Sequence, residues 1–66
     1  MNIELRFLQK AIEDKNYISF MYKNKSFKKE KALKLEKKEE RNILTTEKGT
    51  FYFEKVKKFQ VLKERF

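Results

Sequence analysis

The chain has 66 residues and a net charge of +8, from 18 basic and 10 acidic side chains, with one glycine and no cysteine or histidine. A chain of this length forms one small domain. Without cysteine or histidine it has no disulfide, no thiolate zinc site and no histidine-based catalytic machinery, and a single glycine cannot build a glycine-rich phosphate loop. We therefore expect a protein that is not an enzyme and that uses no cofactor.

The first element is predicted to be a helix over about residues 3–15. Its apolar residues recur at helical spacing, and Asn2 can cap the N-terminus. Charged residues are mixed among these apolar positions, unlike in a signal peptide, and no apolar run approaches the roughly 20 residues that span a bilayer. We expect a cytoplasmic protein that does not contact a membrane. The apolar positions are Leu5, Leu8, Ala11 and Ile12.

A strand rich in β-branched and aromatic residues, YISFMY, is predicted next. Ile18, Phe20 and Tyr22 share one face, and Tyr17 and Met21 share the other. Because both faces carry apolar side chains, we expect both to be covered.

The following segment, FKKEKALKLE, does not fit a regular strand. Phe27 and Leu33 would lie on the same face of a regular strand as Lys29 and Lys31, so a regular strand would turn these two lysines toward the core. An extra residue reverses the facing of everything after it, so we predict a bend or bulge near Lys31 and Ala32.

A hairpin is predicted over residues 42–55, where NILTT and TFYFEK are joined by a three-residue turn, EKG. Gly49 supplies the positive φ that such a turn favours. Phe51 and Phe53 are expected in the core, with Tyr52 on the opposite face. A last strand, KFQVLKERF, completes one helix and five short strands, which predicts a mainly β, α+β fold closed into a small barrel.

The positive charge is concentrated in residues 23–38, which hold eight lysines against Glu30 and Glu36. A basic focus on a small domain is the usual electrostatic footprint of nucleic-acid binding. Lysine greatly outnumbers arginine, which is typical of an AT-rich genome and less typical of forked phosphate recognition. Charge that only keeps the protein soluble therefore remains an alternative to contact with a polyanion.

The order of these segments resembles the WYL domain, a ligand-sensing or nucleic-acid-sensing module of bacterial regulators. The resemblance covers residues 8–66 through LQKAIEDKNYISFMYKN, ALKL, NILTTEKG and FYFEKVKKFQVLKERF. Ala11 and Ile12 match an Ala-Ile pair of the family's leader helix, Tyr22 matches a strand-ending tyrosine, and Phe66 matches the closing phenylalanine. The resemblance implies a leader helix over residues 1–16 and an Sm-like, five-stranded antiparallel barrel over residues 17–66.

The resemblance also implies a ligand surface, because tyrosine and arginine positions line it in the family. Here Leu44 matches the leucine of the family name, while Asn42 and Ile43 stand at its tryptophan and tyrosine. Tyr52 and Lys55 stand at two arginine positions. The chain therefore departs from the family at the side chains that would meet a ligand.

We predict that the chain binds single-stranded nucleic acid or a nucleotide-like anionic ligand in bacterial regulation. Aromatic side chains hold unstacked bases, and lysines hold phosphates. The candidate residues are Tyr22, Lys28, Lys29, Lys31, Lys34, Tyr52, Lys55, Lys57 and Lys58. For Tyr52 the alternative is a strand-pairing surface residue, and for the lysines that follow it a solvated loop.

The alternative function is a protein-interaction or oligomerisation module of a transcriptional regulator, which would bind another protein or itself. Tyr17 and Met21 would form its apolar patch if the fold left them bare.

Overall fold

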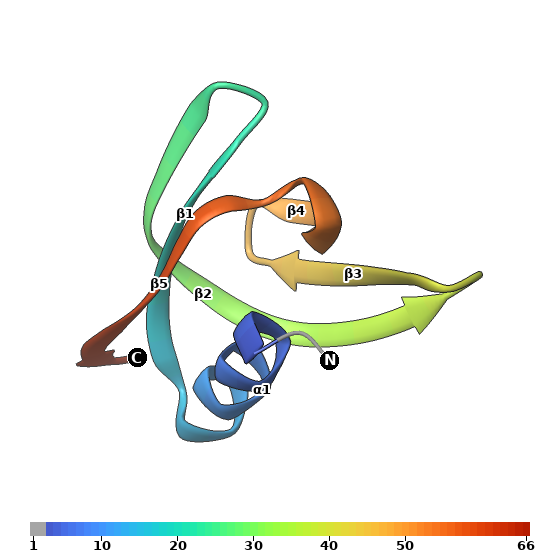
Figure 1. Ribbon diagram of the computed structural model, residues 1–66. Coiled ribbons are helices and arrows are strands. Elements are labelled where there is room, and N and C mark those ends of the chain that lie inside the picture. Colours follow the sequence, from blue (N-terminus) through green and yellow to red (C-terminus); the bar gives the residue numbers. More distant parts are fainter. Residues whose placement is uncertain (1–2) are drawn as a thin grey trace.

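One helix packs against one five-stranded antiparallel sheet in the computed structural model, which describes residues 3–66. The strands lie in the order β4-β3-β2-β1-β5 (Figure 1). The elements are α1 (Ile3–Asp14), β1 (Asn16–Tyr22), β2 (Lys25–Lys38), β3 (Arg41–Thr46), β4 (Gly49–Tyr52), the 3-10 helix η1 (Phe53–Lys55) and β5 (Lys57–Arg65). The predicted helix followed by five antiparallel strands is confirmed, whereas the predicted cap, Asn2, lies outside the described residues.

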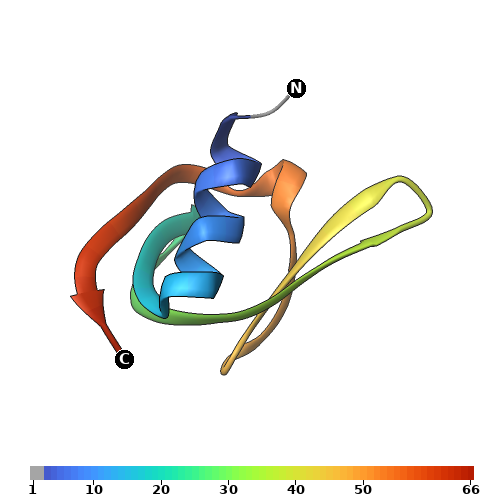
Figure 2. The same ribbon diagram turned by 90° about the horizontal axis from the view of Figure 1, so that it is seen from below.

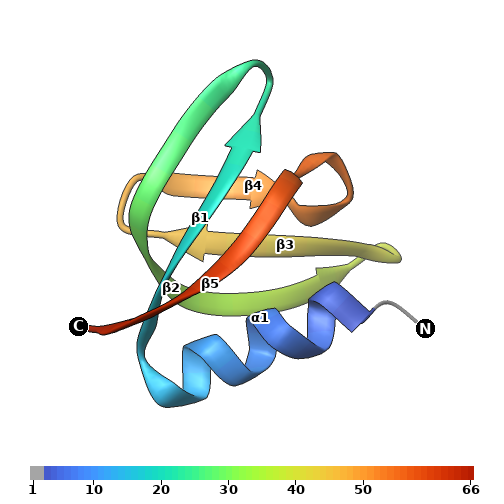
Figure 3. The ribbon, with the colours of Figure 1, turned by 60° about the vertical axis from the view of Figure 1, so that its left-hand side comes forward.

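The sheet is strongly bent but open. Its longest strand, β2, curves so that it pairs with β1 through its first half and with β3 through its second half (Figures 1 and 3). Within residues 3–66, β4 and β5 form the two edges and no pairing joins them. The closed barrel expected from the strand count is therefore not confirmed.

Two irregularities let β2 bend. Across from the step between Ile18 and Phe20 of β1, β2 carries two residues, Lys28 and Lys29, and Lys29 has a φ of 55°. A second irregularity lies at Leu33, where β2 pairs with β3. Extra residues of this kind bend a strand and change which face its later side chains occupy.

These irregularities decide what β2 turns toward the core. Glu30 and Ala32 are buried, whereas Leu33 is 49% exposed. The irregularity predicted near Lys31 and Ala32 is confirmed by the register shift between Ala32 and Lys34. The irregularity at Lys28 and Lys29 was not predicted. The inward charged residue is a glutamate, and neither Lys29 nor Lys31 is fully buried.

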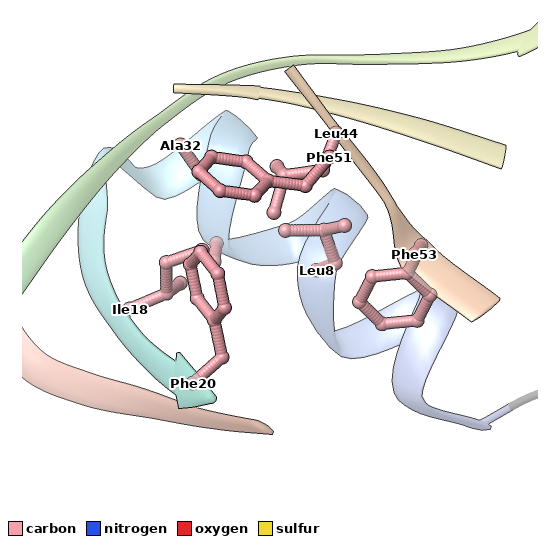
Figure 4. Close-up of a cluster of buried hydrophobic side chains, with 8 residues drawn as sticks. Leu8, Ile18, Phe20, Ala32, Leu44, Phe51 and Phe53 are labelled. Carbon is pink, nitrogen blue, oxygen red and sulfur yellow. The ribbon is translucent and has the colours of Figure 1, made fainter. Parts of the chain in front are cut away.

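The core lies between α1 and the sheet, and α1 runs across the open side of the sheet (Figure 2). Leu8 projects from α1 toward aromatic side chains of the strands (Figure 4). The Phe20 ring stacks on Phe27 at 5.1 Å and meets the edge of Phe51 at 5.2 Å between ring centroids. The buried apolar residues are Leu8, Ala11, Ile18, Phe20, Ala32, Leu44, Phe51 and Phe53, which confirms the predicted inward faces of the helix and of the hairpin.

The second face of β1 is covered as well. Tyr17 and Met21 are both half-buried, and the Tyr17 ring lies 5.4 Å from the Phe66 ring. The bare apolar patch that would support the interaction alternative is therefore not formed at these two residues.

No helix among residues 3–66 has the length and apolar character needed to cross a bilayer, α1 being 12 residues long.

Gly49 has the predicted positive φ, at 135°, and opens β4 opposite Thr46. Only Glu47 and Lys48 lie between these paired residues, which makes the loop one residue shorter than predicted. A Cβ at Gly49 would meet nothing within 4 Å, so a substitution there strains only the backbone. Gly49→Ala is expected to lower the free energy of unfolding by about 1–3 kcal/mol.

Urea unfolding checks this prediction, with Thr50→Ala as the control because Thr50 is the exposed next residue of the same strand. A Gly49→Ala chain as stable as the parent would show that the turn tolerates an L side chain.

Candidate functional site

Two tyrosines from separate hairpins meet on one side of the sheet. Tyr22 ends β1 and Tyr52 ends β4, and the backbone N–H of Tyr52 donates a hydrogen bond to the Tyr22 hydroxyl at 3.3 Å. The Tyr22 ring packs edge-on against Phe51, with centroids 5.1 Å apart. Tyr22 is thus fixed at both ends, while Tyr52 remains 40% exposed.

The chain turns sharply after Tyr52, which brings a lysine back over its ring. Phe53 begins η1, so β4 ends at Tyr52 and does not continue to Lys55 as predicted. The Lys55 Nζ lies 5.9 Å from the centroid of the Tyr52 ring. Although β4 ends at Tyr52, Phe53 is buried together with Phe51, as predicted.

Two further cations lie over the tyrosine rings. Because Ile43 pairs with Tyr52, the start of β3 lies beside Tyr52, and the Arg41 guanidinium carbon is 5.3 Å from the Tyr52 ring centroid. The Lys23 Nζ is 5.7 Å from the Tyr22 ring centroid. Cations within about 6 Å of an aromatic face are attracted to it by the ring quadrupole.

Shallow clefts connect these groups. Arg41, Tyr52 and Lys55 border a hollow of about 240 Å³ together with Glu54. A larger cleft of about 490 Å³ lies between the end of β1 and the start of β5. Its lining includes Tyr22, Lys23, Lys55, Lys57 and Lys58. We call the combined region the tyrosine-lysine surface, and it comprises Tyr22, Lys23, Arg41, Tyr52, Glu54, Lys55, Lys57 and Lys58.

The tyrosine-lysine surface is strongly basic. Its five cations face one carboxylate, that of Glu54, and Glu54 is engaged because its Oε1 accepts a hydrogen bond from the Asn42 N–H at 3.2 Å. A concentration of one charge sign along a cleft attracts anions and accelerates their association. The arrangement therefore offers an exposed aromatic ring for stacking and two cations close to it.

The structure divides the predicted site residues into two groups. Tyr22, Tyr52, Lys55, Lys57 and Lys58 come together on the tyrosine-lysine surface. The other four predicted residues lie along β2 and are Lys28, Lys29, Lys31 and Lys34.

Most of the β2 lysines contact other side chains. The Lys29 Nζ lies 2.7 Å from Glu64 Oε2, and this hydrogen bond and the charge of Glu64 raise the pKa of Lys29 above its ordinary value. The Lys34 Nζ is 3.3 Å from Glu36 Oε1, and the Lys31 Nζ is 5.8 Å from the centroid of the Phe66 ring. Because two of the four already face carboxylates, this group is less suited to hold an anion.

Three residues of the tyrosine-lysine surface were not predicted as site residues: Lys23, Arg41 and Glu54. Ile43 lies next to this surface and lines a hollow of about 270 Å³ between the two tyrosines. Lys23 follows Tyr22 directly, and Arg41 comes two residues before the partner of Tyr52. The register of the β3–β4 hairpin places Ile43 opposite Tyr52 and brings Arg41 close to it. Predicting this register from the sequence would have identified both residues.

Residues 3–66 include no group of three or more acidic, histidine or cysteine side chains that could hold a metal ion. Comparisons of the chain with protein-family models, with curated proteins and with solved structures found no match.

Proposed function

We propose that this chain is a non-enzymatic regulatory module of bacterial type that binds single-stranded nucleic acid, or a nucleotide-like anion, at the tyrosine-lysine surface. The observation that carries the proposal is the position of Tyr52, whose exposed ring lies close to both the Arg41 guanidinium, at 5.3 Å, and the Lys55 Nζ, at 5.9 Å. Bases of any sequence stack on such rings, and flanking cations hold the phosphates.

The contacts divide by chemistry. Tyr52 stacks on a base, and Tyr22 keeps β4 in place through its hydroxyl. Lys57 and Lys58, which are exposed at the start of β5, contact the phosphates that follow. Lysines of this kind contribute a sequence-independent and salt-dependent affinity.

The resemblance to the WYL domain supports the same location. Four positions that it associates with the family's ligand surface lie together here: Tyr22, Ile43, Tyr52 and Lys55. In this proposal the bent, open sheet is a variant of the Sm-like barrel that the resemblance implies.

Fluorescence anisotropy with a labelled thymidine strand of about 12 nucleotides tests the proposal. Tyr52→Ala is expected to weaken binding about 5- to 150-fold, because stacking on one aromatic ring contributes about 1–3 kcal/mol. Tyr52→Phe keeps the ring and is expected to bind like the parent.

Lys55→Ala tests the charge of the surface, with Lys63→Ala as a matched control because Lys63 is also exposed but lies further along β5. Loss of one phosphate contact is expected to reduce the slope of log affinity against log salt by about 0.7. Absence of binding at about 20 mM salt, or equal binding by the parent and both alanine variants of the surface, would contradict the proposal.

A further inference from the structure

A groove of about 450 Å³ runs between α1 and β5, and it shares no lining residue with the tyrosine-lysine surface. Phe7 and Ala11 line it from α1, and Phe59 and Val61 line it from β5. Phe7 is 57% exposed and Val61 is 40% exposed. Bulky apolar side chains gathered at this level of exposure mark an interaction surface.

The helix extends this apolar surface by one turn. Ile3 is 63% exposed and precedes Phe7 by four residues, so the two side chains are neighbours on one face of α1. Along the same face follow Lys10 and Asp14, whose side chains lie 3.7 Å apart. The face therefore begins with two apolar residues and ends with two that carry opposite charges.

Charge indicates which partner can approach α1. The chain carries +8, yet α1 holds three acidic and two basic side chains, the acidic ones being Glu4, Glu13 and Asp14. By contrast, β2 holds seven lysines against Glu30 and Glu36. Two copies of so basic a chain repel each other least where their helices meet.

We infer that a second copy of this chain occupies the groove, with the two α1 helices antiparallel about a two-fold axis at Phe7. A two-fold contact is self-complementary, so each residue before Phe7 faces the one equally far after it. Glu4 then faces Lys10 of the second copy, and the exposed Phe7 side chains of the two copies meet at the axis. The axis thus places opposite charges together twice and joins the exposed apolar residues.

The dimer is expected to be weak. A standard interface buries about 800 Å² per partner, which is about one sixth of the 5103 Å² surface of this chain, and one short helix with its groove supplies less. We expect a dissociation constant of about 10–500 µM.

Sedimentation equilibrium between about 10 µM and 1 mM protein measures this constant directly. Phe7→Ser and Val61→Ser are each expected to raise it about tenfold or more. Leu33→Ser is the matched control, because Leu33 is 49% exposed on β2, outside the groove, and should leave the constant unchanged. Circular dichroism of each variant establishes that it is folded.

A charge exchange tests the antiparallel arrangement. Glu4→Lys and Lys10→Glu each place like charges together and are expected to weaken the dimer several-fold, whereas the double variant restores it. Lys55→Ala, which alters the tyrosine-lysine surface, should leave the dimer unchanged. A chain that stays monomeric at 1 mM, a dimer insensitive to Phe7→Ser and Val61→Ser, or a double variant as weak as the single ones would each overturn the inference.

Discussion

Phe20→Ala is expected to lower the free energy of unfolding by about 3–5 kcal/mol, because removing a buried phenylalanine loses its transfer free energy and leaves a cavity. Phe20 is 1% exposed and contacts the rings of Phe27 and Phe51. A domain of this size rarely has more than about 3–5 kcal/mol of stability from its core. The variant should therefore be largely unfolded at 25 °C.

Urea unfolding followed by circular dichroism measures this loss. Leu33→Ala is the matched control, since Leu33 also lies in the sheet but is 49% exposed, and it should cost less than about 1 kcal/mol. If Phe20→Ala remained folded with a loss as small as that of Leu33→Ala, the aromatic cluster would not be the centre of the core.

Glu30→Leu is expected to raise the free energy of unfolding by about 1–3 kcal/mol, because replacing a buried ion pair by an apolar side chain is often stabilising. Glu30 is 2% exposed, and within residues 3–66 its Oε1 accepts no hydrogen bond. The Oε2 lies 3.5 Å from the Lys48 Nζ, and the Lys48 side chain is 61% exposed. One exposed lysine compensates a buried carboxylate only partly.

The role of Lys48 follows from the same geometry. Lys48→Ala should destabilise the parent by about 1–2 kcal/mol, less than a fully buried pair would lose because water screens the exposed lysine. In the Glu30→Leu background, Lys48→Ala should have no effect. Urea unfolding of all four chains measures the coupling, and a destabilising Glu30→Leu would show that the carboxylate makes a favourable interaction.

The parts of the fold that depend on local pattern were predictable. Helical spacing identified Leu8 and Ala11 as the buried face of α1, and alternation identified Phe51 and Phe53 as the inward face of the hairpin. The irregularity of β2 at Lys28 and Lys29 was not located, because it depends on how β2 registers against β1. For the same reason the sequence did not predict that Glu30 points inward.

The candidate site was predictable to a similar extent. Tyr22, Tyr52 and Lys55 were expected to share a surface, and they do. The pairing of Lys29 with Glu64 joins residues that are distant in the chain, so no local pattern reveals it. Arg41 was not among the predicted site residues, and only the hairpin register brings it to Tyr52.

The most direct test of the proposed function is a titration of the isotopically labelled chain with a thymidine oligonucleotide, followed by amide chemical shifts in NMR spectra. We predict that the largest shifts occur at Tyr52, whose N–H bonds to Tyr22, and at Lys55, Lys57 and Lys58. The β2 lysines and α1 should shift little. Largest shifts along Lys28–Lys34, or no shifts at low salt, would contradict the assignment of the tyrosine-lysine surface as the binding site.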